Sequence, residues 1–200
     1  HPTPDTWHLM IFPFFKVLGV RVDAVEIPEV IAEMERWIAA GEGGHFIAVT
    51  GMHGVTEAQH DPALKDILNA ADLVVPDGMP LVWLGRWRGF PLKRRVYGPE
   101  LMLEFCRVTV GKGYRHFFYG GAPGVADKLA AVLKGRFPGL IVAGTFCPPF
   151  GATPSLRDLR TWRTVRTVRK SKPDLLWVGL STPKQERWMF DFRDLLQIPV

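Results

Sequence analysis

The sequence is poor in cysteine, in long apolar runs and in low-complexity segments. Its two cysteines, Cys106 and Cys147, form neither a disulfide framework nor a metal-ligand pair, which favours a reducing, cytoplasmic compartment. The apolar stretch at residues 9–15 is too short for a membrane-spanning helix, which needs about 20 apolar residues. It also lacks the small-residue cleavage site of a secretory signal. We therefore expect neither a disulfide-stapled scaffold nor a transmembrane segment.

The remaining composition is that of an ordinary globular protein. Of the 200 residues, 47% are hydrophobic and 22% are charged, enough for one domain with a sizeable core. We expect a single domain over residues 1–200, with a lobe boundary conceivable only at the proline-rich turn near 147–151. The formal net charge of +5 favours an anionic partner: a nucleotide, a lipid phosphate, a membrane surface or a nucleic acid.

Apolar runs alternate with helical patterns along the chain. Strands are predicted at residues 17–22, 45–50, 73–76, 115–119, 140–145 and 174–180. Helices are predicted from 28, between 51 and 69 with an interruption near Pro62, at 79–87, from 99, at 125–137, at 155–170 and from 183. This order predicts an α/β fold that is Rossmann-like, with a mostly parallel sheet flanked by helices.

The turn that follows the strand at 73–76 carries one carboxylate, Asp77. Pro76 should end the strand, and Pro80 suits the first turn of the next helix. In open α/β sheets, ligands bind outside the carboxyl ends of the strands, so Asp77 is a candidate catalytic group. The alternative is that Asp77 only shapes the turn, as Asp-Gly pairs often do, and the local pattern alone favours that interpretation.

Two segments could hold a phosphate. Gly120, Gly121 and Gly124 lie between a predicted strand and a helix, where backbone N–H groups and the helix dipole favour anions. The spacing does not match the dinucleotide fingerprint, so a nucleotide phosphate or diphosphate is favoured over NAD; a tight turn without a ligand remains equally compatible. The segment 86–95 is a basic loop whose last residue, Arg95, could grip a diphosphate with two parallel hydrogen bonds.

The first turn of the last predicted helix contains Lys184, Gln185 and Glu186. Glu186 suits the positive end of the helix dipole, whereas Lys184 is unfavourable there and is therefore the more suggestive residue. The basic stripe at residues 157–169 favours a solvated amphipathic helix, with contact to anionic lipid as the alternative. No metal site is expected, because His53, Glu57 and His60 do not form the zinc motif.

Three segments in this order resemble the WecG/TagA/CpsF family of bacterial glycosyltransferases. They are residues 71–79 (ADLVVPDGM), 118–124 (FYGGAPG) and 178–186 (VGLSTPKQE). The resemblance implies an inverting enzyme that moves an N-acetylmannosamine-type sugar from a UDP-sugar to a polyprenyl-diphosphate-linked acceptor. Such enzymes build teichoic acid, enterobacterial common antigen, capsule or exopolysaccharide.

The resemblance also assigns roles to residues. It makes Asp77 the general base and so reverses the local preference for a turn residue. It places Arg95 on the diphosphate, Thr50 and Gln185 near the sugars, and the other predicted contacts in substrate binding, namely Gly120, Gly121, Gly124, Lys184 and Glu186. It places the protein peripherally on the inner face of the cell membrane. No metal or cofactor is expected, because the basic residues could neutralise the diphosphate; nor is a nucleic-acid partner, whereas a homo-oligomer is possible.

The chain departs from the family pattern in places. Met52 replaces an asparagine usual after the second strand, so the sugar contacts there should differ. The family usually continues into an arginine-rich, membrane-targeting segment, which this sequence lacks after Val200; the chain is expected to be truncated and to turn over poorly. The alternative function is a non-catalytic module that binds a nucleotide sugar or a polyanion.

Overall fold

The computed structural model describes residues 12–149 and 159–200. Its strands are β1 (Phe14–Val17), β2 (Val20–Asp23), β3 (Ile47–Thr50), β4 (Leu73–Pro76), β5 (Arg115–Gly120), β6 (Ile141–Phe146) and β7 (Leu175–Gly179). Its helices are α1 (Ile27–Ala40), α2 (Met52–His60), α3 (Pro62–Asn69), α4 (Met79–Trp87), α5 (Gly98–Thr109), α6 (Val125–Arg136), α7 (Leu159–Lys170) and α8 (Lys184–Leu196).

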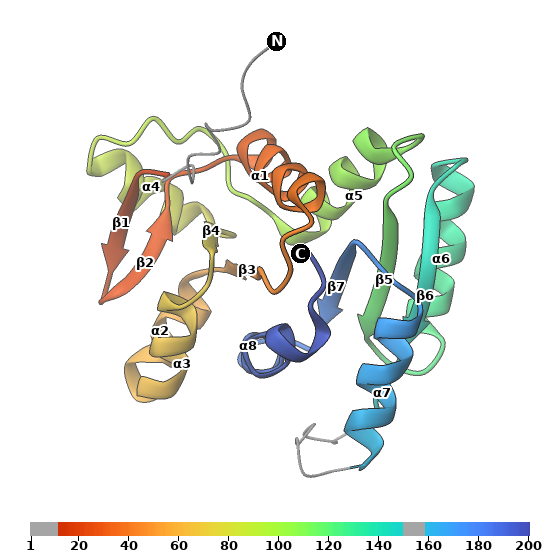
Figure 1. Cartoon of the computed structure of the whole chain (residues 1–200). Coiled ribbons are helices and arrows are strands. Elements are labelled where there is room, and N and C mark those ends of the chain that lie inside the picture. The colour runs from red at the N-terminus through yellow and green to blue at the C-terminus, as the bar shows by residue number, and fades with distance from the viewer. Residues whose placement is uncertain (1–11, 150–158) are drawn as a thin grey trace.

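The predicted α/β class is confirmed. Strands β3 and β4 pair in parallel, and β6, β5 and β7 form a second parallel sheet in that order. Helices α5, α6 and α7 surround the second sheet, while α2, α3 and α4 lie around the first (Figure 1). The predicted lobe boundary near 147–151 lies partly outside the described residues and stays a prediction.

The parallel strands do not form one continuous sheet. The segment after α8 lies between the two sheets (Figure 1). The backbone N–H of Leu176 in β7 donates to Val200 at 2.9 Å, and the N–H of Gly44, ahead of β3, donates to Ile198 at 2.7 Å. This segment therefore bonds β7 on one side and the loop ahead of β3 on the other.

The first predicted strand, residues 17–22, is in fact split between the end of β1 and most of β2. Residues 17–22 contain a tight turn, because Leu18 and Gly19 both adopt positive φ angles, of 50° and 84°. Two consecutive positive φ angles match the twist of an antiparallel hairpin, here β1 paired with β2. Strand β1 begins at Phe14, ahead of the predicted start, and buries Phe15 and Val17.

A buried carboxylate fastens the hairpin to the strand that carries the predicted catalytic residue. Asp23 is fully buried, and its Oδ2 accepts the backbone N–H of Val74 in β4 at 2.8 Å. Its Oδ1 accepts Arg21 Nε at 2.9 Å. Burial raises the pKa of Asp23, while the Val74 N–H and the Arg21 cation oppose that rise. These bonds hold β4 in place from its outer edge.

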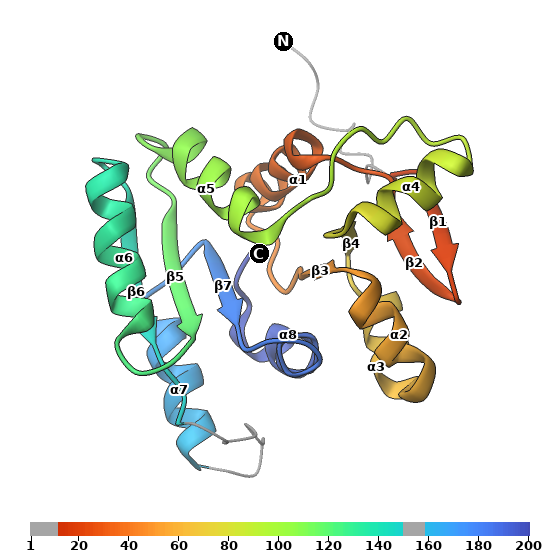
Figure 2. The same ribbon diagram turned by 180° about the vertical axis from the view of Figure 1, so that it is seen from behind.

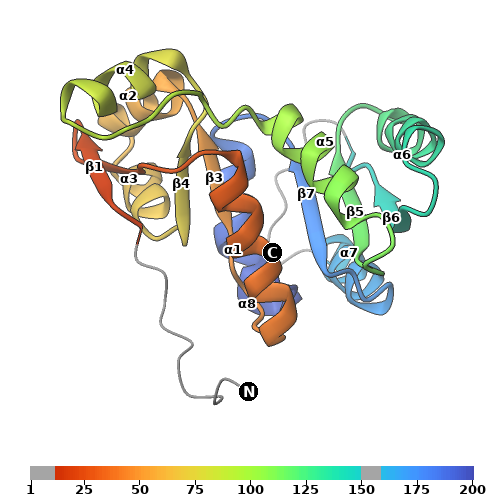
Figure 3. The same ribbon diagram turned by 90° about the horizontal axis from the view of Figure 1, so that it is seen from above.

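Helix α8 joins the two halves through opposite sides of its surface. Met189 and Phe190 pack on the core around β1 to β4, whereas Trp188 and Phe192 pack with Phe117 on the core of the β5–β7 sheet. Seen from behind and from above, α8 lies between the two halves (Figures 2 and 3). None of the helices in the described residues is long and apolar enough to cross a bilayer.

Candidate functional site

Asp77 lies directly after β4, where the backbone is held from both sides. Its N–H donates to the carbonyl of Thr50 in β3 at 2.9 Å, and the N–H of Val96 donates to the carbonyl of Pro76 at 2.8 Å. Helix α4 then begins two residues later, with Gly78 as its N-cap and a proline in its first turn. The carboxylate is therefore presented by a fixed turn at the carboxyl ends of β3 and β4.

The carboxyl group of Asp77 is in an environment that favours a proton acceptor. Burial raises the pKa of Asp77, and the Arg95 cation and a hydrogen bond from the Gly98 N–H partly oppose that rise. Its Oδ1 is buried without a hydrogen-bond partner. A general base works best when its pKa is shifted toward the working pH and one oxygen is free to accept a proton. Asp77 meets both conditions.

Two further buried side-chain oxygens have no hydrogen-bond partner. They are Thr50 Oγ1 and Glu186 Oε2, which with Asp77 Oδ1 make three such atoms in the described part of the chain. Glu186 is fully buried, and its Oε1 accepts the Thr182 hydroxyl at 2.8 Å and the Gln185 amide at 3.2 Å. Buried polar atoms normally find partners, so three unpaired acceptors indicate a site that a polar ligand completes.

Helix α2 brings Thr50 close to the start of α8. A Cβ built on Gly54 would lie 2.2 Å from Thr50 Oγ1 and 3.6 Å from Thr182 Cγ2. The absence of a side chain at Gly54 thus lets β3 and the segment before α8 approach the same point. Thr50 is thus brought near Thr182, whose hydroxyl donates to Glu186.

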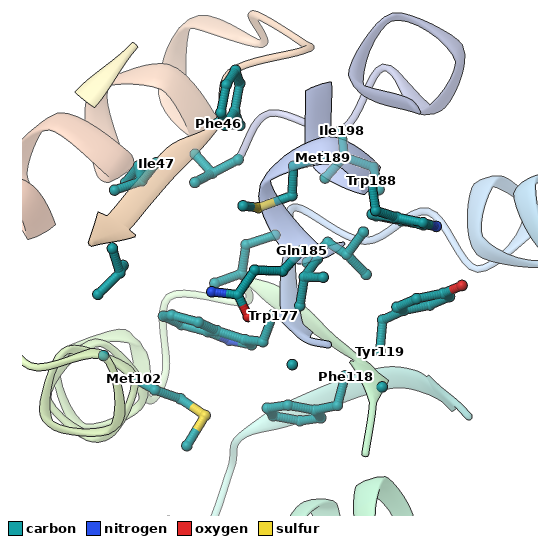
Figure 4. A pocket seen from close by; sticks show the side chains of 18 of the residues that line it. Phe46, Ile47, Met102, Phe118, Tyr119, Trp177, Gln185, Trp188, Met189 and Ile198 are labelled. Carbon is teal, nitrogen blue, oxygen red and sulfur yellow. The ribbon is translucent and has the colours of Figure 1, made fainter. Parts of the chain in front are cut away.

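A pocket of about 460 Å³ lies between the two parallel sheets. Of the predicted site residues, it is lined by Asp77, Gly120, Gly121 and Gln185. Figure 4 shows the Gln185 side chain inside the ring of lining residues, next to Trp177 in this view. Thr50, Arg95, Gly124, Lys184 and Glu186 are not among the lining residues. The pocket thus joins the turn after β4, the end of β5 and helix α8 in one cavity.

The wall of this pocket is largely aromatic and aliphatic, which the sequence analysis did not anticipate. Trp177 of β7 is one lining residue, and its Nε1–H donates to His116 Nδ1 at 3.2 Å. Burial lowers the pKa of His116 to about 4, so the neutral imidazole accepts this bond. The sequence signal for this wall was a tryptophan in an otherwise aliphatic strand, but which way the Trp177 side chain points depends on how the sheet is assembled.

The glycine-rich turn has a packing explanation at its first residue. Gly120 has a φ of 113°, and a Cβ there would lie 2.2 Å from the carbonyl oxygen of Gly179. The N–H of Gly121 donates to the same carbonyl at 3.0 Å, so it is already used. Gly124, with a φ of 78°, is the N-cap of α6, whose first N–H groups are therefore the better candidates for a phosphate.

The two cationic candidates lie at the surface. Arg95 is exposed, and its guanidinium carbon lies 4.5 Å from the centre of the Tyr97 ring. Lys184 is exposed at the start of α8. Met52, which replaces the family asparagine, begins α2 and packs against the core around β1 to β4. That position therefore contributes packing, and the amide hydrogen bonds of an asparagine are absent.

Fold and site together define an α/β protein with a pocket between two parallel sheets, lined by one partly buried aspartate that follows the carboxyl end of a strand. The sequence profile of the WecG/TagA/CpsF family of glycosyl transferases matches residues 15–200. The chain therefore belongs to this family, and the resemblance seen in the sequence is confirmed.

Two relatives carry the name N-acetylglucosaminyldiphosphoundecaprenol N-acetyl-beta-D-mannosaminyltransferase. The protein of Bacillus spizizenii is 28% identical over 170 residues, which are 85% of this chain and 63% of the relative. The protein of Staphylococcus aureus is 26% identical over 174 residues, which are 86% of this chain and 65% of the relative. The chain thus spans slightly less than two thirds of the length of either relative.

Proposed function

We propose that this chain is the sugar-transferring domain of an inverting glycosyltransferase. It would move an N-acetylmannosamine-type sugar from a UDP-sugar to a polyprenyl-diphosphate-linked acceptor in cell-surface polysaccharide synthesis, peripherally on the inner face of the membrane. The observation that carries the proposal is the unpartnered, buried Oδ1 of Asp77 at the edge of the pocket. Membership of the family and the names of the two relatives support the same chemistry.

In the proposed reaction, Asp77 accepts the proton of the acceptor hydroxyl. The hydroxyl oxygen forms a bond to the anomeric carbon of the donor sugar, while the bond from that carbon to the diphosphate oxygen breaks. The electron pair leaves with UDP, and attack from the opposite face inverts the anomeric configuration. Burial favours this role, since the raised pKa makes Asp77 a stronger base than an exposed aspartate.

The remaining polar groups are assigned to the substrates. The free oxygens of Thr50 and Glu186 and the amide of Gln185 would take sugar hydroxyls or the acetamido group, which offer the matching donors and acceptors. Arg95 and the N-terminal turn of α6 would hold the diphosphate and stabilise the charge that develops on it.

Replacement of Asp77 by asparagine tests the proposal. Asp77→Asn should lower turnover by about 10²- to 10⁴-fold, the usual contribution of a general base, while UDP binding is retained. The control is Asp66→Asn, an exposed aspartate of α3, which should keep full activity. Transfer would be measured with a lipid-linked amino-sugar acceptor, and UDP binding by calorimetry.

Stability distinguishes loss of the base from loss of the fold. Because the folded-state pKa of Asp77 is raised, its ionised form destabilises the protein at neutral pH. Asp77→Asn should therefore unfold at the same or a higher temperature at pH 7. Full turnover by this variant would exclude the general-base role. Salt-sensitive binding of duplex DNA in place of UDP would instead favour the alternative, a polyanion-binding module.

The proposed reaction uses no metal ion, because cationic side chains and helix N–H groups can neutralise the diphosphate. Turnover should therefore survive treatment with a chelator. Loss of turnover that added Mg²⁺ or Mn²⁺ restores would contradict this part of the proposal.

A further inference from the structure

Helix α4 exposes two tryptophans on one face. Trp83 is 59% exposed and Trp87 is 82% exposed, and a separation of four residues places them on the same side of the helix. The opposite side packs inward through Leu81, Val82 and Gly85. Large exposed aromatic side chains at helical spacing indicate a binding surface more than a solvated one.

Basic residues lie close to these tryptophans in the sequence. Between Met79 and Arg95 the sequence has five basic residues and no acidic one. The formal charge of this segment is therefore +5, equal to the net charge of the entire chain. Arg86 and Arg88 are exposed, and Arg88 also bonds the backbone carbonyl of Lys16. Within the described parts of the chain, only Arg94 of the five forms a salt bridge, with Glu100.

This surface is connected directly to the candidate active site. Helix α4 begins two residues after Asp77, and the basic loop returns at Val96, whose N–H bonds the carbonyl of Pro76. In Figures 1 and 2, α4 and this loop lie at the margin of the molecule away from β6 and α6. A flat partner could therefore reach α4 without contact to the β5–β7 half.

We propose that the exposed face of α4, defined by Trp83 and Trp87 with the exposed basic residues Arg86, Arg88 and Lys93, docks on an anionic lipid surface. Tryptophan side chains settle at the level of lipid headgroups, and basic residues next to them add attraction of about 1 kcal/mol each near an anionic membrane. A second copy of the chain fits less well, because a symmetric contact would bring two sets of like charges together.

This inference extends the proposed function, and the role of lipid docking rests on that function. An acceptor carried by a polyprenyl chain remains in the bilayer, so an enzyme docked through α4 would hold the turn of Asp77 close to the headgroups. Lipid binding itself, however, is measured without donor or acceptor, and it can therefore fail independently of transfer.

Vesicle sedimentation tests the inference with the 200-residue chain. The chain should bind vesicles of phosphatidylcholine with phosphatidylglycerol much more strongly than vesicles of phosphatidylcholine alone. The double variant Trp83→Ser, Trp87→Ser should lower the apparent affinity for anionic vesicles at least tenfold. The matched control is Trp162→Ser on α7, where the indole is 45% exposed, and it should bind like the parent protein.

The outcomes separate this inference from its alternatives. Loss of vesicle binding in Trp162→Ser but not in the double variant would assign lipid contact to α7 and overturn the proposal. Equal binding of the parent protein to neutral and anionic vesicles would overturn it too. So would a parent dimer that dissociates in the double variant, or a double variant that still binds vesicles but no longer binds DNA. Asp77→Asn should bind vesicles normally; an active Asp77→Asn would contradict the proposed function alone.

Discussion

At the scale of single residues, the chemistry depends on atoms that the fold buries without pairing them. Asp77 Oδ1, Thr50 Oγ1 and Glu186 Oε2 come from a turn, a strand end and a helix start, respectively. Leaving a buried acceptor unpaired costs about 1–3 kcal/mol. A substrate that donates to these oxygens would recover that energy on binding.

The pH dependence of transfer follows from the surroundings of Asp77. With Asp77 as base, kcat/KM should fall as the pH decreases through its pKa, which burial raises and Arg95 lowers. Removing the cation in Arg95→Gln should shift this acid limb to higher pH, and it should also raise KM for the donor. The control is Arg94→Gln, since that side chain is paired with Glu100. An acid limb at the same pH in both variants would show that Arg95 does not act on the base.

At the scale of elements, the first helix after β3 requires a position without a side chain. Helix α2 includes Gly54, although glycine in a helix costs about 1 kcal/mol relative to alanine. The close approach of Thr50 Oγ1 and Thr182 to this backbone explains why that cost is tolerated. The element is thus adapted to the site more than to its own stability.

Gly54→Ala should lower both the stability of the protein and its affinity for the donor. The new methyl group would displace Thr50 Oγ1, so the free energy of unfolding should fall by roughly 1–3 kcal/mol, as in other overpacked cores, and donor affinity should fall with it. Gly135→Ala in α6 is the control, because nothing lies within 4 Å of its Cβ position. That variant should be slightly more stable. Both quantities can be followed by denaturant unfolding and UDP titration; unchanged donor affinity in Gly54→Ala would contradict the expected contact.

At the scale of the whole molecule, the pocket lies between two separate parallel sheets that the C-terminal segment and α8 connect. The segment from Ile198 to Val200 bonds both halves, and α8 packs on both cores. Asp77 comes from one half, whereas Gly120 and Gly121 come from the other. Substrate binding should therefore depend on this joint.

Ile198→Ala tests the joint. Ile198 is buried against the core of the β5–β7 sheet, so its truncation should cost about 2–5 kcal/mol, the usual range for isoleucine to alanine in a core. The thermal shift caused by UDP should also decrease. Val132→Ala on α6, where the side chain is 57% exposed, should change neither. A destabilised Ile198→Ala with an unchanged UDP response would show that the halves bind the donor independently.

Local sequence determined much of the secondary structure. Proline and glycine act within a few residues, so β4, the turn of Asp77 and α4 were predicted close to their observed bounds. The hairpin β1–β2 was missed, since Leu18 is an unusual residue for a positive φ angle and gave no turn signal. The three motifs and their order also identified the family, because such a pattern of residues can be recognised in the sequence without knowing which residues are in contact.

Tertiary structure alone decided which of those residues meet. Asp77 and Gln185 share one pocket, and Thr50 is brought to Thr182 through the missing side chain of Gly54. The sequence also could not show that Ile198 and Val200 would lie between the sheets, or that Trp177 would face the cavity. Such contacts join residues far apart in the chain, and their energies depend on packing in three dimensions, for which no local pattern of residues is sufficient.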